Sequence, residues 1–268
     1  MLKSSRPFTD TPRLLQETPT GRLSVRQVFP PRRAMARGRG AIVVVTLALA
    51  AFAVLFALVR RNRSRLFDLR ITRSLQRVSV PGFDVLMRLV SWPGFPPQSR
   101  IIPPAAAGVW LLLGFPVEAG FQIVAWGAGG VSAIVKFAMG RPRPAPEDVR
   151  VVPGRIGGSS FPSGHVLIYS GVYGFLAFLI ETLVRPRRIR RAATTTLVTC
   201  IALVGPSRIY LGHHWFTDVI ASYLLGGSYL LAMMALYRRV KTRWLNNRRG
   251  LANLPASAAD PENTLPLR

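Results

Sequence analysis

The sequence predicts an all-α membrane protein with six transmembrane helices and interfacial helices between the first two of them. Two observations lead to this fold class. Apolar residues make up 49% of the 268 residues although the formal net charge is +25, so the apolar residues must be concentrated in blocks that the charged residues separate. Several of these blocks are long enough to cross a hydrocarbon core of about 30 Å.

The strongly basic composition restricts the function classes. The arginines lie between apolar runs and do not form one soluble patch, which argues against a nucleic-acid partner. The single cysteine, Cys200, lies within an apolar run. This excludes an intrachain disulfide framework and a cysteine-rich metal site, and Cys200 is interpreted as a small core residue.

The N-terminal part of the chain predicts a tail followed by a first span. Residues 1–40 contain many basic residues, several prolines and no sustained apolar period, which is typical of a disordered segment. The uncharged run 41–59 is long enough to cross a membrane. A cleaved signal peptide is the alternative, but the basic lead-in is too long and the apolar run continues past any cleavage site, so we expect a retained helix.

The segment 60–100 contains short apolar clusters interrupted by arginines, and its apolar residues are spaced as on one side of a helix. They are Leu66, Phe67, Leu69, Ile71, Leu75 and Val78, followed by a second cluster over residues 83–90. Such segments are too charged to cross a membrane. They predict interfacial helices with arginines toward lipid phosphates and apolar side chains toward lipid, although a packing helix outside the membrane is equally open.

The remaining spans are predicted from the apolar runs that follow. These cover residues 103–115, 120–139, 165–184, 192–211 and 215–237. The run 103–115 is the weakest, because the chain after it allows several boundaries. The membrane domain is therefore predicted over residues 41–240, and the basic segment 241–268 is predicted to be a second disordered tail.

Polar residues cluster at the ends of these spans. Lys136 lies in the last turn of the third span, where it could also extend toward the interface, and Arg143 follows in a rigid proline-rich loop. Ser163 is a natural N-cap for the fourth span, so the next backbone N–H groups, at Gly164 and His165, would point out of a helix N-terminus. Such an end is a ready anion site.

The segment SRIYLGHHWFTD, residues 207–218, carries a further cluster. If its end is helical, His214 and Asp218 share a face, and the carboxylate can fix the tautomer of the imidazole. His213 should then point elsewhere, since it is about 140° from Asp218 around the helix. Arg208 is a permanent cation that can hold a tetrahedral anion. Taken alone, a His and an Asp at this spacing can equally be a capping or core pair.

Six spans place these clusters on one side of the membrane. The end of the third span, the start of the fourth, the end of the fifth and the start of the sixth all share that side. Three separate loops thus bring cations, histidines, an aspartate and a helix N-terminus to one boundary. This convergence predicts a functional site for an anion.

The same residues resemble the type 2 phosphatidic acid phosphatase (PAP2) superfamily. KFAMGRPRP matches KxxxxxxRP, FPSGH contains PSGH, and SRIYLGHHWFTD matches SRxxxxxHxxxD, over residues 136–218. The resemblance implies a PAP2-like helical core and a phosphohistidine reaction without metal or other cofactor. It implies that His214 is the nucleophile, that Asp218 orients it, and that His165 is the general acid and base. The phosphoryl oxygens would be held by Lys136, Arg143, Ser163, Gly164 and Arg208.

The resemblance therefore implies an integral membrane lipid phosphatase that acts on a phosphate or diphosphate headgroup. Phosphatidic acid, phosphatidylglycerophosphate and a polyprenyl diphosphate such as undecaprenyl diphosphate are the candidate substrates. A lipid phosphotransferase with the same intermediate and a non-catalytic lipid-binding or transport protein are the alternatives, and the oligomeric state is open. Basic residues are more frequent on the side that bears the termini, so we expect a multi-pass protein of a bacterial plasma membrane with cytoplasmic termini and an extracytoplasmic site.

Overall fold

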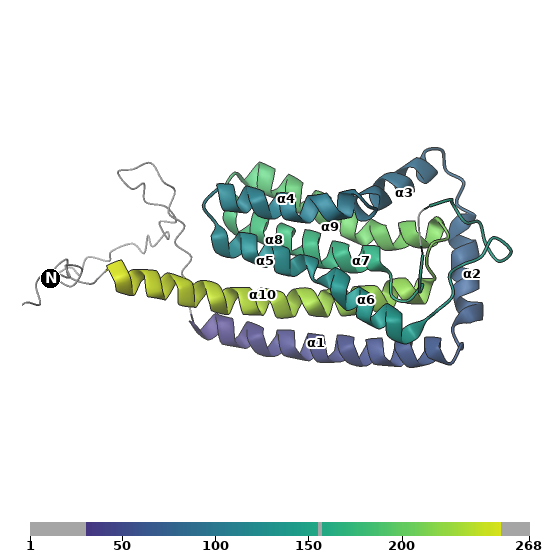
Figure 1. Ribbon diagram of the computed structural model, residues 1–268, viewed down its shortest axis with the longest axis horizontal. Coiled ribbons are helices and arrows are strands. Elements are labelled where there is room, and N and C mark those ends of the chain that lie inside the picture. The colour runs from purple at the N-terminus through teal and green to yellow at the C-terminus, as the bar shows by residue number, and fades with distance from the viewer. Residues whose placement is uncertain (1–30, 155–156, 253–268) are drawn as a thin grey trace, which may run out of the picture. The chain divides into compact units, whose positions relative to one another are not determined.

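The computed structural model describes residues 31–154 and 157–252, and these residues form helices and loops without a β-strand (Figure 1). This confirms the predicted all-α class. The chain divides into two compact units, Met1–Gly40 and Ala41–Arg268, and the description below concerns the second. Most of the predicted N-terminal tail, residues 1–30, and residues 253–268 of the predicted C-terminal tail lie outside the described residues.

Two helices extend beyond the predicted membrane domain. Helix α1 covers Pro31–Arg60 and α10 covers Phe216–Ala252. The inner parts of both predicted tails, residues 31–40 and 241–252, are therefore helical. Basic composition and the lack of a sustained apolar period predicted disorder there, but arginine, lysine and leucine are good helix formers and allow an established helix to continue into a basic segment.

Five helical segments are long and apolar enough to cross a membrane. Within the described residues they are Gly40–Arg60, Pro116–Met139, Gly164–Leu183, Arg187–Tyr210 and Phe216–Asn247. They agree with all of the predicted spans except the second, residues 103–115. That run falls in α4 (Gln98–Leu112), whose 15 residues are fewer than the roughly 20 that a spanning helix needs. The count of six spans is therefore not confirmed.

The predicted interfacial segment forms two helices, α2 (Arg65–Gln76) and α3 (Phe83–Ser91), followed by a short 3-10 turn, η1 (Trp92–Gly94). Figure 1 shows α2 lying across one end of the other helices. On α2 the apolar Leu66 and Phe67 are exposed, whereas Asp68 and Thr72 are buried. A helix with outward apolar side chains suits a membrane interface, and its buried Asp68 is directed at the site described below.

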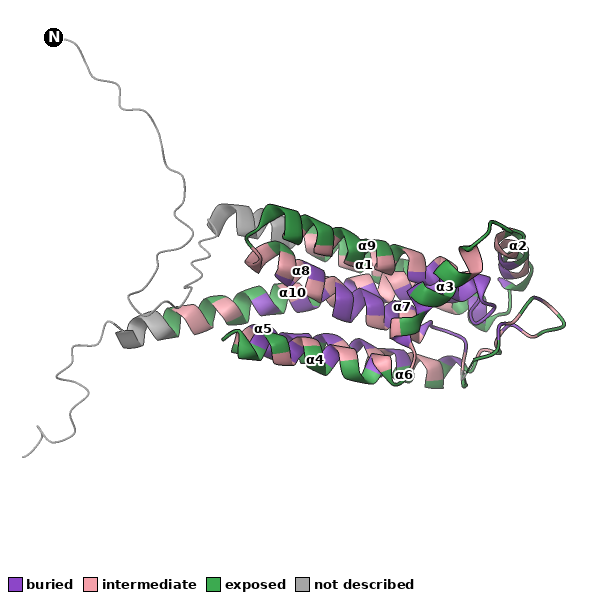
Figure 2. Cartoon of the chain, turned by 90° about the horizontal axis from the view of Figure 1, so that it is seen from above, coloured by how far each residue is buried: buried purple, intermediate pink, exposed green. Residues whose placement is uncertain are grey.

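Two of the spans are built from more than one helical piece. The third consists of α5 (Pro116–Trp126) and α6 (Ala128–Met139), which meet at Gly127. The fourth consists of α7 (Gly164–Ile168), a π-helical turn η2 (Tyr169–Tyr173) and α8 (Gly174–Leu183). The fifth is α9 (Arg187–Tyr210). Figure 2 shows buried residues concentrated along the fourth span and on the helix faces turned toward it.

Small residues allow the third and fourth spans to approach closely. A Cβ atom on Gly171 would lie 2.7 Å from the carbonyl oxygen of Ala125 and 2.8 Å from the Cβ of Ala128. Both distances are shorter than van der Waals contact, so only glycine fits at this position. Close approach through small residues is a common way to pack helices in a membrane, where apolar burial alone gives little drive.

A buried ion pair joins α5 to α10 at the end of the helices away from α2. The Nζ atom of Lys241 lies 2.8 Å from Oε1 of Glu118, and the Tyr237 hydroxyl donates a 2.7 Å hydrogen bond to the same carboxylate oxygen. Glu118 is fully buried. A buried carboxylate with these two partners holds the two helices in register, because removing the lysine would leave its charge unpaired and removing the tyrosine hydroxyl would take away a buried hydrogen bond.

We predict that Gly171→Ala destabilises the protein, whereas Gly130→Ala does not. Overpacking a close contact costs about 1–3 kcal/mol. At Gly130 on α6 a Cβ atom would have no neighbouring atom within 4 Å, so an alanine there gains up to about 1 kcal/mol of helix propensity. Thermal unfolding of the purified variants in detergent measures the difference. Equal melting temperatures for the two variants would contradict the close packing of these spans.

Candidate active site

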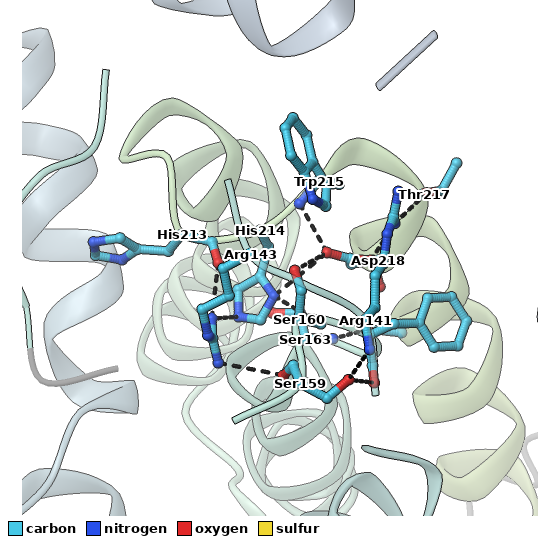
Figure 3. Close-up of polar contacts among 12 residues, drawn as sticks. Arg141, Arg143, Ser159, Ser160, Ser163, His213, His214, Trp215, Thr217 and Asp218 are labelled. Atoms are coloured by element: carbon cyan, nitrogen blue, oxygen red, sulfur yellow. Dashed lines mark hydrogen bonds and ion pairs between the residues drawn. The ribbon is translucent and has the colours of Figure 1, made fainter. Parts of the chain in front are cut away.

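The predicted polar clusters lie at one end of the second unit. Helix α6 ends there, α7 begins, α9 ends and α10 begins, and α2 lies across them (Figure 1). Figure 3 shows side chains from the loop after α6, the start of α7 and the loop before α10 directed at one another. The structure thus brings together residues that are far apart in the sequence.

His214 lies in the loop between α9 and α10, and its imidazole is held by two contacts. Its Nδ1 atom is 2.7 Å from the backbone carbonyl of Ser160, and its Nε2 atom is 3.4 Å from Nη1 of Arg143. A carbonyl oxygen can only accept, so Nδ1 carries the hydrogen and Nε2 keeps its lone pair. This is the tautomer that a nucleophilic Nε2 requires.

The predicted direct contact between His214 and Asp218 is not formed. His214 Nδ1 lies 3.7 Å from Asp218 Oδ2, which is too long for a hydrogen bond. Helix α10 begins at Phe216, so His214 precedes the helix and the assumed helical spacing does not apply. Asp218 Oδ2 instead accepts hydrogen bonds from the Ser160 hydroxyl at 2.5 Å and the Trp215 backbone N–H at 2.8 Å, so Ser160 contacts both Asp218 and His214.

A glycine before the two histidines allows this loop geometry. Gly212 has φ of +71°, and a Cβ atom there would lie 2.2 Å from the carbonyl oxygen of Arg150. Both features require glycine. The backbone N–H groups of His213 and His214 then donate to the Arg208 carbonyl at 3.0 and 3.3 Å, which fixes the loop against the end of α9.

The two adjacent histidines have different surroundings. His213 points away from His214, as expected (Figure 3), and its Nε2 lies 2.8 Å from the carbonyl oxygen of Val152. Burial and the nearby Arg208 lower the pKa of His213 to about 4. Burial, with Arg208 and Arg143 close by, also holds the pKa of His214 well below its usual value. Both imidazoles are therefore neutral at neutral pH.

Backbone carbonyls hold two of the predicted cations. The Arg143 guanidinium donates to the carbonyls of Gly157 at 2.9 Å, Gly158 at 3.2 Å and His213 at 2.8 Å. The Nζ atom of Lys136 donates to the Ser159 carbonyl at 3.1 Å. Burial lowers the pKa of Arg143, which remains a cation at neutral pH because its usual value is so high. These carbonyls orient the two cations without neutralising them.

Three of the predicted residues carry buried polar atoms without a hydrogen-bond partner. Among the described residues these atoms are Nε and Nη2 of Arg208, Nε2 of His165 and Oγ of Ser163. Ser163 precedes α7 as predicted, but its hydroxyl makes no capping hydrogen bond. An unpaired buried donor costs about 1–3 kcal/mol, and a tetrahedral oxyanion offers the acceptors that these groups lack.

Gly164, the remaining predicted residue, begins α7 close to the cations. A Cβ atom on it would lie 3.5 Å from the Ser132 hydroxyl and 4.0 Å from Cε of Lys136. The start of the fourth span therefore faces the end of the third. Within the described ranges, no group of three or more His, Cys, Asp or Glu side chains is placed to hold a metal ion.

Sequence reasoning missed the contribution of the turn before α4. The ring of Phe95 lies 4.8 Å from the Arg208 guanidinium and 4.6 Å from the His165 imidazole. A Cβ atom on Gly94 would lie 2.3 Å from Cδ2 of His165. The turn therefore fixes one face of each of these two side chains. An aromatic residue in a Pro/Gly-rich turn was the available signal, and it does not specify a contact.

Arg141 and Asp68 were also missed. Arg141 forms ion pairs with Asp68 at 2.6 Å and with Asp218 at 2.5 Å. It lies between Lys136 and Arg143 but is not one of the fixed positions of the motif. The available signal for Asp68 was a lone acidic residue on an otherwise basic amphipathic segment.

Comparison with known proteins places these residues in context. Residues 117–242 match the family model of the PAP2 superfamily. Phosphatidylglycerophosphatase B of Bacillus subtilis (strain 168) is 38% identical over 68 residues, which are 25% of this chain and 34% of that protein. The match thus spans about one third of the relative's length.

One solved structure shows a related fold, and a second is reported with it. The crystal structure of a transmembrane PAP2-type phosphatidylglycerolphosphate phosphatase from Bacillus subtilis has a TM-score of 0.56 and 21% identity, and the alignment covers 73% of this chain and 96% of that one. The structure of Aquifex aeolicus LpxE has a TM-score of 0.49 and 22% identity, over 62% and 93% of the two chains. The likeness to the first, together with the apolar helices, identifies the chain as an integral membrane protein.

We predict that His213 and His214 have opposite tautomers at neutral pH. His213 must donate from Nε2 to the Val152 carbonyl, and His214 must donate from Nδ1 to the Ser160 carbonyl. Imidazole ¹⁵N chemical shifts of the labelled protein report which nitrogen carries hydrogen, and His213→Ala and His214→Ala assign the signals. Protonation of both nitrogens of His214 at pH 7, or hydrogen on its Nε2 alone, would contradict the geometry.

Proposed function

Because residues 117–242 match the family model of the PAP2 superfamily, we propose that the protein is a membrane lipid phosphatase whose nucleophile is His214. The observation that carries this proposal is that a neutral histidine and buried polar atoms without partners lie at one site. His214 is neutral and keeps a lone pair on Nε2, next to Arg143. Around it, buried polar atoms of Arg208, Ser163 and His165 lack a protein partner. Such a site suits a nucleophile that attacks a bound phosphoryl group.

The cations are needed because a phosphate monoester carries up to two negative charges that repel a nucleophile. Lys136, Arg143 and Arg208 supply up to three positive charges to neutralise the oxygens, and this makes a metal ion unnecessary in the proposed mechanism. The Ser163 hydroxyl and the backbone at Gly164 complete the phosphoryl site. Arg208 is fully buried against the Phe95 ring, so its charge acts with little screening by solvent.

The first chemical step forms a bond between His214 Nε2 and phosphorus as the bond from phosphorus to the lipid oxygen breaks. His165, which must be protonated at the start of this step, donates a proton to the departing lipid oxygen and becomes neutral. The imidazole of His214 becomes positively charged while Nδ1 stays bonded to the Ser160 carbonyl. Asp218, 3.7 Å from Nδ1, stabilises that charge without taking the proton.

The second step returns the enzyme to its starting state. A water molecule attacks phosphorus, the bond to His214 Nε2 breaks, and His165 accepts the proton that the water loses. Free phosphate then leaves. A lipid or sugar hydroxyl in place of water would make the protein a phosphotransferase, and the products distinguish the two reactions.

We propose a lipid headgroup phosphate as the substrate class, with phosphatidylglycerophosphate as the first candidate. The support is the activity of the Bacillus subtilis relative, which is a phosphatidylglycerophosphatase. Phosphatidic acid and undecaprenyl diphosphate present the same terminal phosphoryl group to the same cations and are the other candidates.

Phosphate release by the purified full-length protein in detergent tests the proposed function. The substrates are phosphatidylglycerophosphate, phosphatidic acid and undecaprenyl diphosphate, each with and without EDTA. We expect free phosphate from at least one of them at a rate that EDTA does not change, and inhibition by vanadate, which mimics the five-coordinate transition state. No release from any of the three would contradict the proposed function, and an EDTA-sensitive rate that magnesium restores would contradict the metal-free mechanism.

We predict that His214→Ala lowers kcat by several orders of magnitude, whereas His213→Ala has a much smaller effect. Removal of a covalent nucleophile removes the whole reaction path, while His213 faces the Val152 carbonyl on the other side of the loop. Both variants are assayed with the best substrate, and size-exclusion chromatography checks that they fold. Similar losses in the two variants would contradict the assignment of the nucleophile.

We also propose that both ends of the membrane domain face the cytoplasm and that the site faces the opposite side. Arg60, at the end of α1, donates to the carbonyls of Ala138 and Met139 at the end of α6, so α1 runs toward the site. Helix α10 begins at the site and runs away from it. The basic segment 185–191 and the basic part of α10 lie at the other end, which favours the cytoplasm for that end.

Cysteine labelling measures this orientation. In a Cys200→Ser background, we predict that Glu147→Cys in the exposed loop near the site reacts with a membrane-impermeant thiol reagent on intact cells. Arg187→Cys at the exposed start of α9 should react only after the cells are opened, because the reagent cannot cross the membrane. The reverse pattern would place the site in the cytoplasm.

A further inference from the structure

A buried charged cluster lies behind the proposed nucleophile, and the motifs contain only one of its three members. Arg141 Nη2 is 2.6 Å from Asp68 Oδ2, and its Nη1 is 2.5 Å from Asp218 Oδ1. The side chain of Arg141 is 10% exposed, and both carboxylates are fully buried. Charges in such surroundings are tolerated only when they neutralise one another, so the three positions depend on each other.

Asp68 reaches this cluster from the polar stripe of α2. Its Oδ1 accepts the backbone N–H of Thr217 at 2.8 Å, and its Oδ2 accepts the Thr217 hydroxyl at 2.9 Å. The same hydroxyl accepts a 2.8 Å hydrogen bond from Arg141 Nη1. A carboxylate at the first turn of a helix is favourable, since the unpaired N–H groups there carry partial positive charge. Asp68 therefore fixes both Arg141 and the start of α10.

The cluster continues to His214 through Ser160. The Ser160 hydroxyl donates to Asp218 Oδ2 at 2.5 Å, and the Ser160 backbone N–H donates to the Arg141 carbonyl at 2.8 Å. The Ser160 carbonyl is the acceptor for His214 Nδ1. Asp218 and Arg141 thus determine where the carbonyl that orients the nucleophile lies.

We propose that Asp68 is a positioning residue for His214, acting through Arg141, Asp218 and Ser160. The proposal rests on the proposed function and assigns a role to α2 in it. Asp68 does not contact the phosphoryl group. Asp68 is the second carboxylate that pairs with Arg141. With both carboxylates present, Arg141 is held between them, and this fixes its position relative to Asp218. Two carboxylates and one guanidinium also leave the cluster with a net negative charge behind an imidazole that becomes positive when phosphorus bonds to Nε2.

A double-mutant cycle between Asp68 and Asp218 tests this role. The variants are Asp68→Asn, Asp218→Asn and the double variant, and kcat and KM are measured on folded, monodisperse full-length protein with wild type and His214→Ala alongside. We expect Asp68→Asn to lower kcat by about 10-fold or more with KM within about twofold of wild type, since a positioning residue does not bind substrate. In the double variant, kcat should lie within about threefold of Asp218→Asn alone, since residues in one network lose their effects together.

The matched control is Glu118→Gln. Glu118 is also fully buried, paired with a cation at 2.8 Å and bonded to a hydroxyl at 2.7 Å, but it lies at the other end of the helices. Glu118→Gln should lower the melting temperature and leave kcat within about twofold of wild type, because it perturbs a buried ion pair far from the reacting atoms. A purely structural role for Asp68 would make Asp68→Asn behave in the same way.

Three outcomes would overturn the proposal. The first is a kcat of Asp68→Asn within about twofold of wild type. The second is a double variant whose fold-loss of kcat equals the product of the two single fold-losses. The third is a loss of kcat in Glu118→Gln as large as that in Asp68→Asn. If Asp68→Asn does not fold, Thr217→Val decides, because it removes the hydroxyl between Asp68 and Arg141 without changing charge. Thr217→Val should lower kcat in the wild-type background but should cause no further loss when it is added to Asp218→Asn. If the wild-type protein releases no phosphate, the proposed function is overturned as well. If the wild type is active and His214→Ala is inactive, the three outcomes above concern only the role of Asp68.

Discussion

The structure of the site depends on how its cationic side chains are neutralised. Arg141 is paired with two buried carboxylates, Asp68 and Asp218. Lys136, Arg143 and Arg208 have no carboxylate partner among the described residues and are held by backbone carbonyls, the Ser91 hydroxyl and the Phe95 ring. These weaker acceptors orient the three side chains but do not cancel their charge, which remains available for a phosphoryl group. One arginine is therefore part of the framework, and the other three cations are those of the proposed phosphoryl site.

The same division is consistent with a buried histidine as the proposed nucleophile. The surrounding cations and burial keep His214 neutral, and a carbonyl acceptor on Nδ1 leaves the lone pair on Nε2. A carboxylate bonded directly to Nδ1 would bring a full negative charge next to a site built for anions. In the structure the Ser160 carbonyl contacts Nδ1 of His214, the Ser160 hydroxyl donates to Asp218, and the charge of Asp218 is shared with Arg141.

Much of this organisation could be predicted from the sequence. Apolar length and charge placement predicted the helical class and most of the spans, and the polar residues at span ends converge as the order of the spans requires. The orientation of His214 could not be predicted, because it depends on Gly212 and on a helix that begins two residues after the histidine. Asp68, Arg141 and Phe95 were missed because tertiary contacts, and not periodicity, give them their partners. The run 103–115 was predicted as a short span from its apolar composition, which does not show whether the helix that contains it is long enough to cross a membrane.

Direct detection of the phosphorylated enzyme tests the central claim of this account, which is that His214 Nε2 bonds to phosphorus. The protein is mixed with ³²P-labelled lipid phosphate, quenched under denaturing alkaline conditions within one turnover, digested and mapped by mass spectrometry. The account predicts acid-labile phosphate on Nε2 of His214 and none in the His214→Ala variant. Phosphate on His165 or Ser163, or turnover by an active enzyme with no covalent label at any time, would contradict it.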